Sequence, residues 1–199
     1  KVNSISELNN KANGIQTEKG FYKADIVVSN MDVYYTYKEL LKNHEQPKKS
    51  LAQEKSSSAL IFYWGISKEF PQLDLHNIFF SEDYKKEFEY LFDKKDLSED
   101  WTVYIHVSSK DKKDDAPDKK ENWFVMVNAP ANYGQDWDKL KTKAKSLILK
   151  KLNHCLKTNI EELIETEEVL DPILIDTKTN SHRGSLYGTS SNSRYASFL

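Results

Sequence analysis

The strongest hydrophobic pattern in the chain is the run at residues 59–66, which is apolar throughout and interrupted only by Gly65. The run is rich in aromatic and β-branched side chains and is too short to span a membrane, so it predicts a strand. Both faces of this strand are apolar, and a strand with that pattern is covered on both sides. We therefore expect a central strand, with one face on helices and the other either in the core or lining a cavity for an apolar ligand.

Residues 1–30 combine short apolar runs with turn residues, which predicts a β-meander. Asn13-Gly14 and Lys19-Gly20 supply turn chemistry. The meander is expected to close on residues 24–30 (ADIVVSN), whose continuous β-branched run is typical of a strand buried in a parallel sheet.

Asp32 is placed to cap a helix that continues to Leu41, and the polar stretch at residues 43–57 predicts a linker between domains. Strands and helices then alternate. Strands are predicted at residues 76–80, 101–109 and 122–130, and a further strand or extended segment at 160–170. Helices are predicted from Glu82 or Asp83 to about residue 94, at 135–156 and from Asp171-Pro172 onward. The charge-dense residues 110–121 predict a solvated loop. This order indicates an α/β protein with a mixed sheet backed by helices.

Composition narrows the function classes. The 199 residues carry a formal charge of −2 with lysines interleaved among acidic residues, so no basic face is present to bind nucleic acid. The single cysteine, Cys155, excludes an internal disulfide and fits a reducing cytosol. Because Cys155 falls on the apolar stripe of the helix at residues 135–156, we expect a buried structural thiol.

No residues for catalysis or metal binding emerge from spacing. The histidines lack zinc-site spacing, and neither a G-x-S-x-G nor a G-x-G motif occurs. His106 is either a polar point in a pocket or an ordinary satisfied residue at the rim of the core. An enzyme with so aromatic a sheet would act on an apolar substrate and leave the chemistry to a cofactor. The alternative is a binding or carrier module for an apolar ligand, without chemistry.

Five blocks of the sequence, in order, resemble the phytoene desaturase family, the FAD-dependent carotenoid desaturases of bacteria. They are ADIVVSNMDVYYTYKELL (24–41), SSSALIFYWGI (56–66), LHNIFFSEDYKKEFEYLF (75–92), VYIHVSSKDKKDDAP (103–117) and HRGSLYGTSSN (182–192). FYWG and RGSLYGTSSN are more similar to the hydroxycarotenoid 3,4-desaturase branch. Where the family blocks have A-P-E-G, this chain has APDK at residues 116–119, which indicates a remodelled turn.

The resemblance implies FAD as cofactor and hydride transfer from a polyene to flavin N5. Since the FAD fingerprint is absent, the chain is expected to be part of a larger protein. By analogy, residues 1–42 belong to a Rossmann-like FAD-binding domain, with the β-meander and a returning strand. Residues 43–55 are a linker, 56–182 form the substrate-binding domain, and 183–199 return toward the FAD domain.

The resemblance also implies site residues and partners. Ser29 and Asn30 are expected beside the flavin, no catalytic residue is assigned, and no metal is expected. The partners are a carotenoid or other long polyene and the remainder of the parent polypeptide. The location is cytoplasmic, with peripheral contact to the cytoplasmic membrane. The residues expected to line a substrate tunnel are Phe62, Trp64, Tyr104, Phe124, Met126 and Tyr187.

Overall fold

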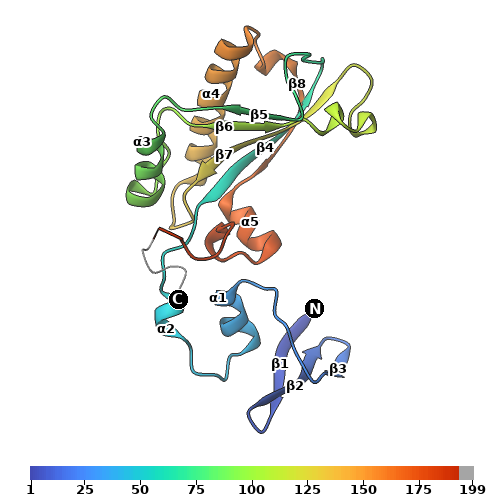
Figure 1. Cartoon of the computed structure of the whole chain (residues 1–199), viewed down its shortest axis with the longest axis vertical. Helices are drawn as coiled ribbons and strands as arrows, with labels where there is room; N and C mark the ends of the chain where they lie inside the picture. Colours follow the sequence, from blue (N-terminus) through green and yellow to red (C-terminus); the bar gives the residue numbers. More distant parts are fainter. Residues whose placement is uncertain (193–199) are drawn as a thin grey trace.

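The computed structural model describes residues 1–192 and contains a small N-terminal sheet and a larger sheet backed by helices (Figure 1). The small sheet is the predicted meander, with strand order β1-β2-β3. Its strands are β1 (Val2–Leu8), β2 (Lys11–Thr17) and β3 (Gly20–Lys23). The first turn lies at Asn9-Asn10, where both residues adopt the left-handed φ values that a tight hairpin needs. The turn predicted at Asn13-Gly14 is therefore wrong, and Gly14 lies inside β2.

The strand predicted at residues 24–30 is also not formed. The side chains of Ile26 and Val28 are 80% and 85% exposed. Among residues 1–192, no strand lies beside this segment to accept its backbone hydrogen bonds, so the β-branched run stays extended and unpaired. Its sequence is suited to burial, but its burial requires a neighbour outside the part of the chain that the structure describes.

The segment that joins the two sheets begins as predicted. The Asp32 side chain accepts a hydrogen bond from Tyr34 N at 2.8 Å and caps α1 (Val33–Tyr35), which continues as a π-helical turn (Thr36–Leu40). The predicted linker is less open than expected: it contains α2 (Lys48–Leu51), and Lys55 and Ser56 are buried at its end.

The large sheet has five strands in the order β5-β6-β7-β4-β8. Its strands are β4 (Ser58–Ile66), β5 (His76–Phe79), β6 (Val103–His106), β7 (Glu121–Ala129) and β8 (Ile164–Leu170). β4 lies inside the sheet between β7 and β8, as its apolar run predicts, but the central strand of the five is β7. Its second face is not fully covered, because Tyr63 is 43% exposed. Every neighbouring pair in this part of the chain is antiparallel, so the sheet is not mixed in strand direction.

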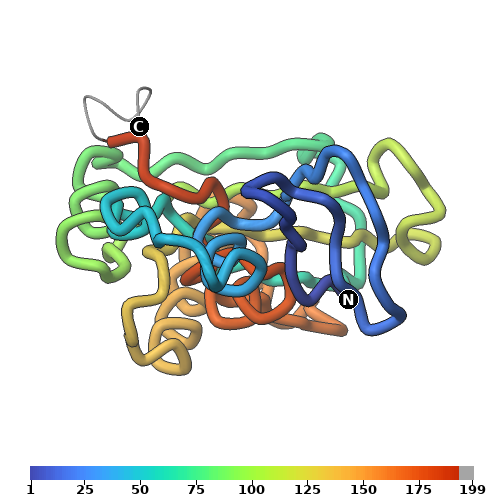
Figure 2. Tube along the Cα trace, turned by 90° about the horizontal axis from the view of Figure 1, so that it is seen from below, coloured from blue at the N-terminus to red at the C-terminus, as the bar shows by residue number. Residues whose placement is uncertain are grey.

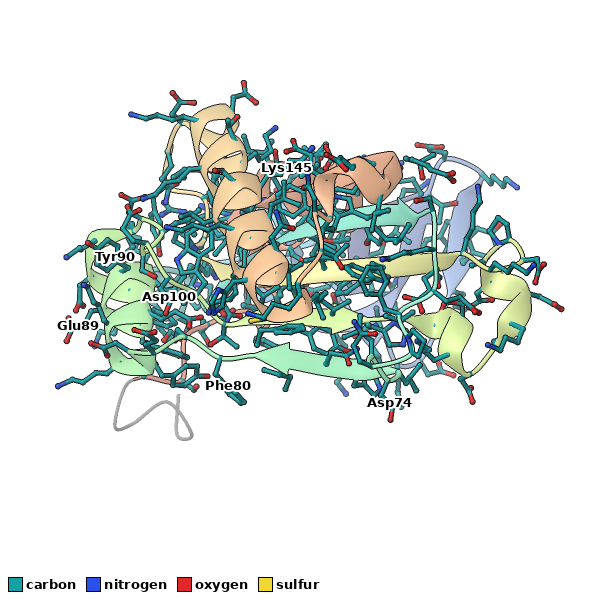
Figure 3. The ribbon with its side chains drawn as sticks, turned by 90° about the horizontal axis from the view of Figure 1, so that it is seen from above. Asp74, Phe80, Glu89, Tyr90, Asp100 and Lys145 are labelled. Carbon is teal, nitrogen blue, oxygen red and sulfur yellow. The ribbon has the colours of Figure 1, made fainter. Side chains whose placement is uncertain are left out.

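One face of the sheet packs on the long helix α4 (Trp137–Leu156), which lies across the strands in Figure 3. Lys145 on this helix donates a hydrogen bond to Glu167 of β8 at 3.0 Å. The buried stripe of α4 is formed by Trp137, Leu140, Ala144, Ile148, Leu149, Leu152 and Leu156. Cys155 is exposed, which corrects the prediction of a buried thiol. The buried residues at the end of the helix, Ile148, Leu152 and Leu156, follow one another at steps of four. The next buried position after Leu152 is therefore Leu156 and not Cys155.

The remaining helices begin at aspartate caps. Asp83 precedes α3 (Tyr84–Glu89) and its π-helical continuation (Tyr90–Lys94), and Asp171 precedes α5 (Pro172–Thr179). Short 3₁₀ turns occur at Ser108–Lys110, Lys113–Asp115, Glu161–Leu163 and His182–Gly184. No helix within the described part of the chain is long and apolar enough to cross a membrane.

The loop at residues 110–121 is solvated in its middle, as predicted, but its two ends form an ion pair whose carboxylate is buried. Lys110 Nζ lies 2.6 Å from Glu121 Oε1. The Glu121 carboxylate also accepts hydrogen bonds from Phe70 N at 2.9 Å and from Trp123 Nε1 at 2.7 Å. This carboxylate therefore joins the loop before β5 to the start of β7.

The tail runs back along the segment before β4, where the red and cyan parts of the chain meet (Figures 1 and 2). Ser56 N donates to Gly188 O at 3.0 Å, and Leu186 N donates to Ser57 O at 3.0 Å. Gly184 adopts φ +69°, and a Cβ there would collide with the Pro172 backbone. The tail therefore approaches the backbone of α5 closely at Gly184.

Candidate functional site

The register of the large sheet separates two sets of side chains. Phe62 pairs with Val125 and Trp64 with Trp123, and these residues point to the core between the sheet and α4. The alternate residues point to the opposite side, which we call the open face. In this face Tyr63 of β4 lies beside Phe124 of β7. The residues of the open face include Ile61, Tyr63, His76, Ile78, Tyr104, His106, Phe124 and Met126.

Aromatic rings form a continuous row across the open face, from β5 to β4. The ring centroids of His76 and Tyr104 are 6.0 Å apart, those of Tyr104 and Phe124 are 6.2 Å apart, and those of Phe124 and Tyr63 are 5.5 Å apart. We call these residues the aromatic row. Tyr63 and His76 are exposed, whereas Tyr104 and Phe124 are half-buried. The row is therefore a surface accessible to a ligand.

The open face changes from apolar to polar along the strand direction. Residues that are paired across the sheet form cross-strand lines perpendicular to the strands, which are distinct from the aromatic row. The first line is almost entirely apolar and consists of Ile78, Tyr104, Met126, Ile61 and Leu170. The next contains His76, His106, Phe124, Tyr63 and Glu168. The third contains Asn122, Gly65 and Thr166. Ile61 is buried, so a ligand lying along the strands would meet Ile78, Tyr104 and Met126 at one end and hydrogen-bonding groups at the other.

A hollow of about 560 Å³ lies at the polar end of this face. Tyr63 and Phe124 contribute aromatic walls, and His106, Asn122 and Glu168 contribute polar groups. The Asn122 amide is already engaged, because it donates to Ser108 Oγ at 2.6 Å and accepts from Ser109 N at 3.1 Å. The hollow can thus hold an apolar group that ends in a small polar one.

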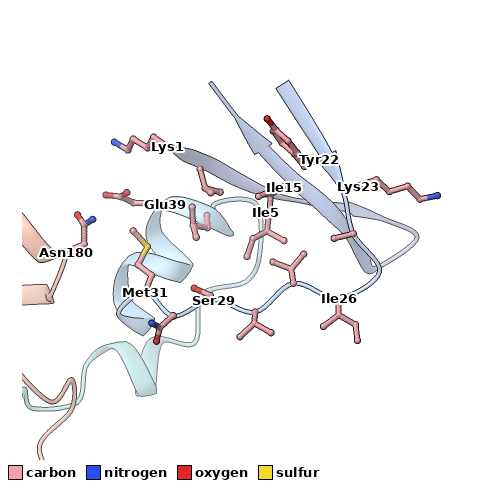
Figure 4. A pocket seen from close by; sticks show the side chains of 16 residues that line it. Lys1, Ile5, Ile15, Tyr22, Lys23, Ile26, Ser29, Met31, Glu39 and Asn180 are labelled. Atoms are coloured by element: carbon pink, nitrogen blue, oxygen red, sulfur yellow. The ribbon is translucent and has the colours of Figure 1, made fainter. Parts of the chain in front are cut away.

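A second hollow, also of about 560 Å³, lies between the meander and residues 24–31 (Figure 4). Its walls are mainly apolar and include Ile5, Ile15 and Ile26. Ser29 and Asn30 are among the residues that line it. The Ser29 hydroxyl lies 2.7 Å from Thr36 Oγ1, which holds it against the helical segment.

Between the two sheets, ionisable side chains gather around a stacked pair of rings. The Tyr34 and His182 rings stack at 3.5 Å and 7°. Tyr35 donates to Asp176 Oδ1 at 2.6 Å, and burial together with this carboxylate raises the pKa of Tyr35. Burial, assisted by the nearby cations, lowers the pKa of His182.

Lys55 lies in the same cluster and is 4% exposed. Its ammonium has no hydrogen-bond partner among residues 1–192, and it lies 5.9 Å from the centroid of the Tyr34 ring. Burial lowers the pKa of Lys55, with Asp32 opposing the change and Arg183 adding to it. The rings and carboxylates of this cluster link α1, α5 and the tail.

Comparison with known proteins identifies relatives along the whole chain. No protein-family model matches it. The chain is 57% identical over 198 residues to a 1-hydroxycarotenoid 3,4-desaturase of Flavobacterium sp., covering 100% of this chain and 41% of that protein. The chain is homologous to carotenoid desaturases. The resemblance drawn from the sequence blocks is thereby confirmed.

Other relatives share the same region. A phytoene desaturase of Phycomyces blakesleeanus is 32% identical over 90% of this chain and 32% of its own length. A 4,4'-diaponeurosporene oxygenase of Staphylococcus aureus is 32% identical over 94% of the chain and 39% of its own length. The chain therefore spans less than half the length of the curated relatives it matches.

The fold also has a counterpart among solved structures. An oxidoreductase from Methanosarcina mazei aligns with a TM-score of 0.54 at 14% identity, over 86% of this chain and 35% of that one. At this identity the similarity concerns the fold alone. It supports the predicted fold class of sheets backed by helices.

The residues predicted to bind substrate do not form one site. Tyr104, Phe124 and Met126 share the open face. Phe62 and Trp64 are each 1% exposed and pack in the core on the other side of the sheet. Tyr187 is exposed in the tail, and its backbone N–H donates to Ser56 Oγ at 3.0 Å. Tyr63 and His76, which complete the aromatic row, were not predicted, although Tyr63 alternates with Phe62 and Trp64.

The surroundings of Ser29 and Asn30, the residues predicted to contact the flavin, suit one part of FAD but not the whole cofactor. The hollow beside Ser29 and Asn30 offers apolar walls and a few polar groups, which suit one edge of a flat ring system. The sequence contains no G-x-G turn, so it offers no phosphate-binding loop for the rest of FAD. Ser29 and Asn30 are therefore suited to hold only a small part of the cofactor.

Proposed function

We propose that the protein is an FAD-dependent carotenoid desaturase and that this chain supplies the surface on which the polyene lies. The aromatic row carries the proposal, because it is an unbroken line of rings on an accessible sheet face. The homology to carotenoid desaturases supports the same class of substrate. A long conjugated chain is flat and offers almost no hydrogen-bonding groups, so it must be bound by apolar contact.

The side chains of the open face would position the polyene. Tyr63, Tyr104 and Phe124 offer ring surfaces for dispersion contacts, and Met126 adapts to the space between them. Each Å² of apolar surface removed from water contributes roughly 25 cal/mol, so a long polyene gains most of its affinity from length. Binding along this face would hold one particular carbon pair at a constant place relative to the cofactor.

FAD, when bound, supplies the acceptor for the hydride that leaves the polyene, while a proton leaves the neighbouring carbon and a C=C bond forms. Within this chain, Ser29 and Asn30 are proposed to contact the flavin. We place residues 1–42 in the FAD-binding domain, 43–55 in the linker, 56–182 in the substrate-binding domain and 183–199 in the segment that returns toward FAD. The remaining polypeptide would hold the cofactor's phosphates. Peripheral contact with the cytoplasmic membrane would give access to a substrate that resides in lipid.

The name of the Flavobacterium relative points to a narrower substrate class. We propose that the polyene used by this protein carries a terminal hydroxyl group. The polar end of the open face supports this, because a pure hydrocarbon would leave those groups without partners.

The experiment expresses the whole reading frame that contains this chain and supplies it with candidate carotenoids. Pigment analysis should show products with additional double bonds. The Phe124→Ala variant should lower kcat/KM about tenfold or more, because it removes the middle of the aromatic row. Tyr84→Ala, an exposed aromatic residue on α3, should change it less than about twofold. Binding of polyene without any product would favour a carrier module, and equal effects of the two variants would contradict the proposed surface.

A further inference from the structure

A small imidazole cluster lies at the edge of the aromatic row. The rings of His76 and His106 stack with centroids 5.0 Å apart and an interplanar angle of 30°. His76 Nδ1 is 2.7 Å from Tyr104 OH, so His76 is held by both a stack and a hydrogen bond. The imidazole of His106 has no hydrogen-bond partner within residues 1–192 and is half-buried. It is thus oriented by its neighbour while its own ring nitrogens remain available.

His106 also lines the hollow at the polar end of the open face. Its cross-strand partner is Phe124, a member of the aromatic row. A ligand that lies along the strands and crosses the aromatic row would therefore reach His106 just beyond the apolar residues Tyr104 and Met126. The other polar side chains that line the hollow have neighbours of their own. Asn122 is engaged by Ser108 and Ser109, and Glu167 by Trp64 and Lys145. Glu168 lies 3.8 Å from Lys178, and the Thr166 hydroxyl lies over Gly65.

A hydroxyl group requires one acceptor for its proton and one donor for its oxygen. A neutral imidazole offers both on a single rigid ring, with one nitrogen as donor and the other as acceptor. An ammonium or a carboxylate offers only donors or only acceptors. The combination of an aromatic row and one available imidazole matches an alcohol at the end of a long apolar chain.

We propose that His106 binds the terminal hydroxyl group of the polyene substrate and determines the preference for hydroxylated over plain hydrocarbon polyenes. This inference rests on the proposed desaturase function and adds the recognised group and the residue that recognises it. His76 positions the His106 ring through their stack, and Tyr104 fixes His76 in turn.

The test uses the full-length, FAD-loaded enzyme and a pair of polyenes that differ only in a terminal hydroxyl group. The variants are His106→Leu, which removes the hydrogen-bonding groups, and His106→Gln, which retains a donor and an acceptor. His154→Leu, at an exposed histidine on α4, is the matched control. The two readouts are kcat/KM from product analysis and equilibrium binding from the change in polyene absorption.

We expect the unaltered enzyme to favour the hydroxylated polyene in both readouts. His106→Leu should reduce that preference on the order of 10- to 100-fold, which corresponds to losing one well-made buried hydrogen bond. His106→Gln should restore part of it, and His154→Leu should leave it intact. Equal losses on both polyenes would assign His106 a merely structural role, and an unchanged preference would place the hydroxyl elsewhere; each result overturns the proposal.

The same measurements distinguish failure of the desaturase proposal from failure of the recognition proposal. If neither polyene is converted but binding still discriminates through His106, the desaturase proposal fails and the recognition proposal stands. If both polyenes are converted without discrimination, the desaturase proposal stands and the recognition proposal fails. If neither polyene binds, both fail.

Discussion

Replacing Glu121 by Gln is expected to destabilise the large sheet strongly, because this side chain is 2% exposed and its carboxylate serves three donors. Gln keeps the shape but replaces one oxygen by an NH₂ group. In either amide orientation this group faces a donor, namely Trp123 Nε1 or the pair formed by Phe70 N and Lys110 Nζ. Removing one member of a buried ion pair costs about 3–5 kcal/mol. Since Lys110 is partly exposed and can turn to water, we expect about 3 kcal/mol.

Urea denaturation followed by tryptophan fluorescence measures this loss. With an m-value of about 2 kcal/mol/M, the midpoint should fall by about 1.5 M without a change in slope. Glu165→Gln is the matched control, because its ion pair with Lys120 is exposed and should contribute at most about 1 kcal/mol. A Glu121→Gln midpoint equal to that of Glu165→Gln would refute the reasoning that burial makes the first pair indispensable.

Three further predictions concern the tail and the cluster between the sheets. Gly184→Ala should lower the free energy of unfolding by at least about 2 kcal/mol, because the added Cβ collides with Pro172 and the backbone is left-handed. Gly188→Ala is the control, since Gly188 has a similar φ but open space around it. Equal decreases in melting temperature for the two variants would contradict the predicted collision. Lys55→Met should raise the free energy of unfolding by about 1 kcal/mol at pH 7, because it removes a buried ammonium. Burial lowers the pKa of Lys55, so this gain in stability should shrink as pH rises from the folded-state pKa toward the unfolded-state pKa. A lower stability of the variant in urea denaturation would show that the ammonium has a favourable partner. The pKa of His182 is likewise lowered, so the stability that its neutral ring contributes is fully present above the unfolded-state pKa and is lost as pH falls through the folded-state pKa. His182→Phe should therefore flatten the decline of the free energy of unfolding between pH 7 and pH 5. An unchanged slope would exclude protonation of His182 as the cause of that decline.

Local chemistry in the sequence was sufficient to predict most element types and several of their starts. Asp32, Asp83 and Asp171 each precede a helix and cap it in the structure. The two-faced apolar run of β4 predicted a central strand, and β4 lies inside the sheet, beside the central strand β7. These predictions succeed because caps and face patterns depend on residues near one another in the chain.

Features that depend on distant neighbours were not predictable in the same way. Alternation showed that Phe62 and Trp64 share a face, but it does not say which face meets α4. Residues 24–30 have the composition of a buried strand, and their pairing depends on a partner strand that residues 1–192 do not provide. Glu121 lies in a charged stretch typical of solvent, and only the fold brings Phe70 and Trp123 to its carboxylate.

The most direct test of the central claim is photocrosslinking from the open face. A benzophenone-bearing phenylalanine analogue replaces Tyr63 in one full-length protein and Tyr84 in another; both tyrosines are exposed, but only Tyr63 belongs to the aromatic row. After irradiation with bound polyene, mass spectrometry should find the covalent adduct at position 63 and not at position 84. Absence of an adduct at position 63, or equal adducts at both positions, would contradict the claim that the polyene lies on this face of the sheet.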